Sequence, residues 1–96
     1  PAPETDEVWI KCAANDWTAA QMTETEVKGT FVYETTLVEG SFGNMGANIG
    51  VDEAMNGASW YALEDIAGAN VGDKVVYQFV QTKGVEGTLT IIPANK

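Results

Sequence analysis

The chain has 96 residues, of which 45% are hydrophobic and 9% aromatic, a composition typical of one folded domain rather than a disordered segment. Its 14 acidic and five basic residues give a net charge of −9, which argues against nucleic acid and disfavours an anionic membrane surface, because both repel acidic proteins. No apolar run approaches the roughly 20 residues of a membrane-spanning helix, so we expect no membrane insertion.

The chain opens with a Pro-rich, acidic segment, residues 1–7, which reads PAPETDE. This composition is typical of the end of an extended linker. We therefore expect a single folded domain over residues 8–96, and the linker predicts that this domain belongs to a larger multidomain protein.

The first expected strand covers residues 7–13, EVWIKCA. Alternation with a period of two places Val8, Ile10 and Cys12 on one face, and Trp9 and Lys11 on the other. The next four residues, ANDW, predict a turn, because Asn and Asp side chains bond nearby backbone and tolerate left-handed geometry. Cys12 is the only cysteine, so no internal disulfide is possible and we expect a buried thiol.

The middle of the chain mixes one clear strand with less regular segments. Residues 17–27 predict a loop that passes into a short strand, because their Thr residues disfavour a stable helix. Residues 29–40, GTFVYETTLVEG, predict a central strand, since both of its faces carry apolar side chains. The glycine-rich stretch that follows predicts a short irregular strand over 42–49 and then a loop.

The last part of the chain predicts three further strands. The segment SWYAL, residues 59–63, is expected as a short strand, followed by a loop with a turn at Gly72-Asp73. Residues 74–81 and 85–93 predict a hairpin joined through 82–84. In total, six or seven short strands favour an all-β fold, an antiparallel β-sandwich of immunoglobulin-like layout, with a small closed barrel as the alternative.

The three tryptophans suggest a binding surface. Trp17 follows a turn, where no strand partner requires its ring, while Trp60 and Tyr61 are adjacent and must point to opposite sides of their strand. An exposed aromatic ring can stack on the C–H face of a sugar, and amides in the turns, such as those of Asn15 and Asn48, can bond its hydroxyls. The alternative is that these rings belong to the core, where Trp and Tyr are usually buried.

Catalytic and metal sites find little support in the composition. The chain has no histidine, which excludes Ser-His-Asp and Cys-His nucleophilic sites and imidazole-bound metals. The adjacent acidic pairs Asp52-Glu53 and Glu64-Asp65 lack the alternating oxygen spacing of an EF-hand loop. We therefore expect a protein that is not an enzyme and has no metal site and no cofactor.

The order of these features resembles the small starch-binding β-sandwich modules. These are the early-set glycan-binding domains of amylases and pullulanases, and the domains of outer-membrane starch-binding lipoproteins. The shared pattern is a strand, a turn, a Trp, a Met and then G-x-F-x-Y followed by L-x-x-G-x-F. In this chain the pattern falls on Trp17, Met22, Gly29, Phe31, Tyr33, Leu37, Gly40 and Phe42.

The resemblance implies non-catalytic binding of an α-glucan, starch or a maltooligosaccharide, at the cell surface or outside the cell. It implies that Trp17 and Trp60 stack on glucose rings, that Tyr61 adds a second platform, and that amides such as Asn15 and Asn48 hold hydroxyls. The competing hypothesis is a structural or protein-interaction domain of a surface assembly or a phage capsid. That hypothesis predicts three inward-facing tryptophans and an exposed apolar strip along a sheet edge.

Overall fold

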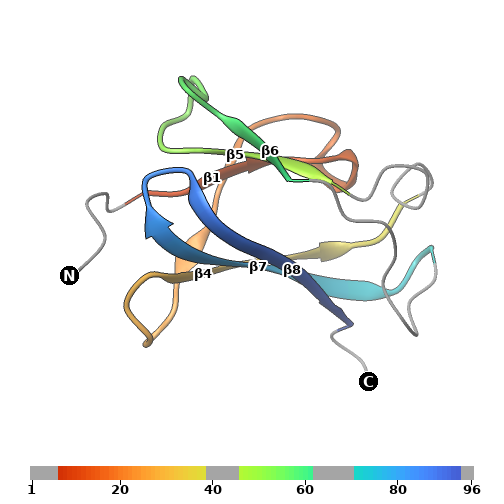
Figure 1. Ribbon diagram of the computed structural model, residues 1–96. Coiled ribbons are helices and arrows are strands. Elements are labelled where there is room, and N and C mark those ends of the chain that lie inside the picture. The colour runs from red at the N-terminus through yellow and green to blue at the C-terminus, as the bar shows by residue number, and fades with distance from the viewer. Residues whose placement is uncertain (1–6, 39–45, 62–70, 94–96) are drawn as a thin grey trace.

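The computed structural model describes residues 7–38, 46–61 and 71–93, which form two antiparallel four-stranded sheets packed together (Figure 1). Sheet A has the strand order β2-β1-β5-β6, and sheet B has the order β3-β4-β7-β8. The strands are β1 (Trp9–Lys11), β2 (Ala20–Gln21), β3 (Thr23–Glu24), β4 (Thr30–Thr36), β5 (Ala47–Gly50), β6 (Ser59–Tyr61), β7 (Lys74–Lys83) and β8 (Glu86–Pro93). The predicted antiparallel β-sandwich is confirmed, whereas its immunoglobulin-like layout stays a prediction.

The core lies between the sheets and is built from alternate residues of the strands. All three residues predicted for the inner face of the first strand, Val8, Ile10 and Cys12, are fully buried. β4 lies between β3 and β7, which confirms that it is a central strand. The other buried apolar residues are Met22, Phe31, Leu37, Ala47, Ile49, Val75, Tyr77, Phe79, Leu89 and Ile91.

The segment predicted as a loop and one short strand instead supplies two strands of two residues each. β2 pairs with β1 in sheet A, and β3 pairs with β4 in sheet B. The chain changes sheets at Met22, whose side chain is buried and whose N–H donates to the carbonyl of Val8 at 2.7 Å. This crossing explains why the described residues contain eight strands rather than six or seven.

The predicted final hairpin is present, but its turn begins two residues later than expected and ends one residue later. β7 continues to Lys83, and the two-residue turn is Gly84-Val85, with Gly84 at φ 57°. The register between β7 and β8 shifts between Gln81 and Lys83, which is where a bulge adds the extra residue to β7.

Some predictions fall partly or wholly outside the described residues. They are the linker at 1–7 except for Glu7, the start of the irregular strand at 42–45, and most of the loop that follows Tyr61. The described part of that irregular region contains β5, and the strand predicted at 59–63 is described as β6 up to Tyr61.

Two titratable groups lie inside the core and touch each other. Burial raises the pKa of the Cys12 thiol above its ordinary 9.0, although backbone hydrogen bonds from Asn15 and Ala14 partly offset this. Burial, and then the nearby Cys12, raise the pKa of the Tyr77 phenol well above its ordinary 10.0. Both groups are therefore held in their neutral forms by the folded state.

These raised pKa values predict a loss of stability at alkaline pH. Below about pH 8 both groups are protonated in the folded and the unfolded chain, so they add no pH dependence. Above that pH the unfolded chain releases protons that the folded chain retains, and the free energy of unfolding falls by up to about 1.4 kcal/mol per pH unit for each group. Urea unfolding at a series of pH values measures this slope.

Tyr77→Phe keeps the buried ring and removes the titrating hydroxyl, so its alkaline slope is expected to decrease by the contribution of one group. An unchanged slope in Tyr77→Phe would show that the alkaline loss has another origin.

Candidate functional site

A tight turn that follows the end of β1 positions Trp17. The turn begins with the 3₁₀ segment Ala13–Asn15. The Asn15 side chain closes it from both ends: Oδ1 accepts the N–H of Cys12 at 3.0 Å, and Nδ2 donates to the carbonyl of Ile10 at 3.1 Å. The prediction that an Asn in this turn bonds nearby backbone is confirmed.

The two residues after Asn15 both have a left-handed backbone, Asp16 at φ 58° and Trp17 at φ 57°. This conformation costs roughly 1–2 kcal/mol for each residue that carries a side chain. The N–H of Trp17 donates to the carbonyl of Cys12 at 2.9 Å, which holds the chain in this shape. The turn thus maintains a strained backbone at a residue whose large side chain lies outside the core.

Trp60 reaches the same surface from β6, on the opposite edge of sheet A from β2. Its indole lies directly against the backbone of Gly46, where a Cβ would come within 2.5 Å of Cζ2 and 2.9 Å of Cη2, and would lie closer still to the backbone carbonyl oxygen of Tyr61. No side chain larger than that of glycine fits beneath the ring in this position. Gly46 therefore determines how closely the indole of Trp60 can approach the sheet.

The indoles of Trp17 and Trp60 stack on each other, with ring centroids 6.1 Å apart and an angle of 27° between their planes. Trp17 is 42% exposed and Trp60 is 45% exposed. We call this pair the tryptophan platform. The prediction that one of Trp60 and Tyr61 faces away from the core is confirmed, and Trp60 is the one that does.

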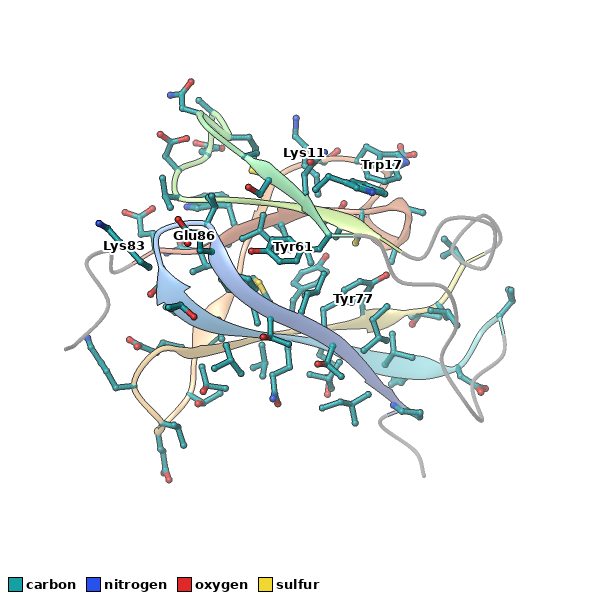
Figure 2. All side chains as sticks on the ribbon, viewed as in Figure 1. Lys11, Trp17, Tyr61, Tyr77, Lys83 and Glu86 are labelled. Atoms are coloured by element: carbon teal, nitrogen blue, oxygen red, sulfur yellow. The ribbon has the colours of Figure 1, made fainter. Side chains whose placement is uncertain are left out.

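Two polar side chains lie in the same outward row of sheet A as Trp60. In the register of the sheet, Trp60 is opposite Asn48 and Asn48 is opposite Lys11. The row from Lys11 on β1 to Trp60 on β6 therefore crosses two inter-strand spacings, about 10 Å. Figure 2 shows Lys11 rising from β1 near Trp17 on the outer side of sheet A. Among the described residues, neither the ammonium of Lys11 nor the amide of Asn48 has a hydrogen-bond or ion-pair partner.

The next row of sheet A contains Trp9, which pairs with Gly50. Trp9 is half-buried, and its indole N–H donates to a carboxylate oxygen of Glu7 at 2.8 Å. Met55 covers Gly50, since a Cβ at Gly50 would lie 2.8 Å from its sulfur. The outer side of sheet A therefore carries apolar side chains in both rows.

The structure does not bring Tyr61 to the tryptophan platform. Tyr61 points between the sheets (Figure 2), where its ring meets Phe79 edge to face with centroids 5.5 Å apart. Its hydroxyl donates to the carbonyl of Val85 in the β7–β8 turn. These contacts tie sheet A to sheet B, so the position of Tyr61 is explained by packing.

The predicted amides also divide into two kinds. Both amide atoms of Asn15 are bonded to backbone within the turn, whereas Asn48 lies on the outer side beside Trp60. The two predicted binding residues that share the platform surface with Trp17 are therefore Trp60 and Asn48. Sequence reasoning did not assign Lys11 or Gly46 to the site; the alternation of β1 had placed Lys11 on this face, but only the register brings it next to Asn48.

In the described ranges, no group of three or more Cys, Asp or Glu side chains is arranged to hold a metal ion. Within those ranges, too, no helix has the length and apolar character needed to cross a bilayer.

No family model, curated protein or solved structure matches this chain.

The contact between Gly46 and Trp60 predicts a specific effect of Gly46→Ala. The added methyl group would overlap both the indole of Trp60 and the backbone carbonyl oxygen of Tyr61, so β6 must shift. We expect the stacking with Trp17 to be lost and the free energy of unfolding to fall by about 1–3 kcal/mol. Aromatic circular dichroism reports the stacking, and urea unfolding reports the stability.

Gly57→Ala is the matched control. Gly57 has a positive φ, 66°, which Gly46 does not, and nothing lies within 4 Å of an added Cβ. We expect Gly57→Ala to lower stability through its backbone alone and to leave the aromatic signal unchanged. An unchanged aromatic signal in Gly46→Ala would contradict the contact between Gly46 and the indole.

Proposed function

We propose that this domain is a non-catalytic carbohydrate-binding module whose site is the tryptophan platform. The observation that carries the proposal is the pair of stacked indoles, each nearly half exposed, on the outer side of sheet A. Two large apolar rings exposed to water form a surface suited to binding, because a ligand that covers them removes apolar area from water.

The backbone at Trp17 supports the same conclusion. Left-handed conformation in a bulky residue is rare and persists only where surrounding contacts maintain it, and such strain is concentrated at functional sites. A purely structural domain would be more stable with Gly or Asn at this position, because these residues adopt a left-handed backbone at a lower cost. The strain is explained if exposing the indole of Trp17 beside Trp60 serves binding.

The chemistry around the platform suits a neutral saccharide. A sugar ring offers a C–H face to an indole and hydroxyl groups at its rim. Asn48 supplies amide donors and an acceptor, and Lys11 supplies ammonium donors, one and two strands away from Trp60. A neutral ligand is not repelled by the net charge of −9.

The α-glucans, starch and maltooligosaccharides, are the ligand class that we propose first, on the strength of the resemblance to starch-binding modules. One open platform buries few ligand atoms, so we expect dissociation constants of about 10–1,000 μM. Several such modules in one protein at the cell surface or outside the cell would bind a polysaccharide far more tightly, through effective concentration.

The competing hypothesis of a structural or protein-interaction domain predicts that all three tryptophans pack inward. Trp17 and Trp60 do not. It also predicts exposed apolar residues along a sheet edge, and the exposed Ile92 on the edge strand β8 meets that expectation. The exposed Val80 of β7 lies farther along the same sheet, opposite Thr88. An interaction surface is therefore compatible with the fold, but it lies on sheet B and leaves the platform unexplained.

Native gel electrophoresis in the presence of soluble starch tests the proposal. We expect starch to retard the wild-type protein, and we expect Trp17→Ala and Trp60→Ala each to weaken binding about tenfold or more, because each removes one stacking ring. The same gel with glycogen, xylan and soluble cellulose derivatives identifies the ligand class.

Trp9→Phe is the matched control, because it changes a tryptophan of the same sheet that is not part of the stacked pair. Its mobility in starch should equal that of the wild type. Equal mobility of the wild type and Trp17→Ala in every polysaccharide would reject the proposed function.

A further inference from the structure

The four edge strands of the sandwich differ greatly in length. In the described part of the chain, β2 and β3 have two residues each and β6 has three, but the edge strand β8 has eight. An edge strand presents a row of unpaired N–H and C=O groups, and most proteins keep such strands short or protect them with charges, prolines or bulges. Among the edge strands as far as the structure describes them, β8 is the one long enough to accept another strand along a useful length.

β8 also lacks the usual protection along most of its length. Its acidic residue, Glu86, and its proline, Pro93, stand at its two ends, and the six residues between them are uncharged. The chain as a whole is 20% charged. Along this run of six uncharged residues, a second strand meets no charged side chain of β8.

The core is least well sealed along β8. Leu89 is 5% exposed and Ile91 is 8% exposed, whereas every other buried apolar residue in the described ranges is 3% exposed or less. Both side chains point between the sheets from the outermost strand of sheet B. A further strand beside β8 would cover them with its own inward-facing side chains.

We propose that β8 pairs antiparallel with β8 of a second copy of this chain, joining two sheets B into one eight-stranded sheet. This interface lies on sheet B and is independent of the carbohydrate platform on sheet A.

The sequence of β8 fits a two-fold axis through Thr90. In an antiparallel pair, residues that lie directly opposite each other point to the same face of the sheet. When two copies of one strand pair about a two-fold axis, opposite residues must therefore have numbers that are both odd or both even. About Thr90, Leu89 faces Ile91 of the other copy on the core side, and Thr88 faces Ile92 on the outer side. The two Thr90 side chains then face each other, a favourable cross-strand pair.

Charge opposes this association and gives it a characteristic salt dependence. Each copy carries −9, and repulsion between two such chains is screened as ionic strength rises. Interfaces that bury less than about 1,200 Å² are weak, so we expect the dimer to form between about 10 μM and 1 mM and more readily at high salt.

Sedimentation velocity of the wild type over this concentration range tests the proposal. We expect the weight-average sedimentation coefficient to rise from that of a monomer toward that of a dimer, and to rise further in about 0.5 M NaCl. Thr90→Lys places two ammonium groups opposite each other at the axis, and we expect it to weaken dimerisation at least tenfold.

Two variants of opposite charge at Thr90 distinguish loss of edge pairing from a folding defect. Thr90→Lys and Thr90→Glu should each be monomeric alone, but an equimolar mixture should form a heterodimer, because Lys then faces Glu across the axis. Gln78→Lys is the matched control: Gln78 is paired with Thr90 in the same outward row, one strand away from the edge. It should dimerise like the wild type.

Three results would overturn the proposal. One is a wild type that remains monomeric at about 1 mM in high salt. Another is a mixture of the two Thr90 variants that remains monomeric while the wild type dimerises. The third is loss of dimerisation in Gln78→Lys, which would place the interface on the open face of sheet B rather than at the edge of β8.

Discussion

The turn between Cys12 and Trp17 is the constraint on which the proposed site depends. Asn15 closes this turn with both of its amide atoms, and the carbonyl of Cys12 accepts the N–H of Trp17. With the backbone held in this left-handed form, the indole of Trp17 lies on that of Trp60 instead of entering the core. Asn15 thus serves the candidate site indirectly, as a positioning residue rather than as a ligand-binding one.

The inner faces of the two sheets form the core, whereas the outer side of sheet A carries the candidate site. The apolar core lies between their inner faces, and Tyr61 of sheet A connects the two sheets through its contacts with Phe79 and Val85. Because that core is rigid, β1, β5 and β6 hold Lys11, Asn48 and Trp60 in one row on the outer side of sheet A. A shallow site made of rigidly placed rings and a few polar groups needs little rearrangement to bind a sugar.

Much of the fold was predictable, because period-two alternation is a strong signal where one face of a strand is buried. It predicted the inner face of β1 and the opposite directions of Trp60 and Tyr61. The site was only partly predictable, since alternation does not say which of two adjacent aromatic residues faces the core. The closeness of Gly46 to Trp60, and the use of Asn15 within its own turn, depend on contacts between segments that sequence spacing does not encode.

The most direct test of the account is an NMR titration of the three indole N–H resonances with maltoheptaose. If the platform is a sugar-binding surface, the resonances of Trp17 and Trp60 shift together along one binding curve, while that of Trp9, which donates to Glu7, changes little. If neither platform resonance moves at millimolar ligand, or if Trp9 moves as much as the stacked pair, the tryptophan platform is not the binding site that we propose.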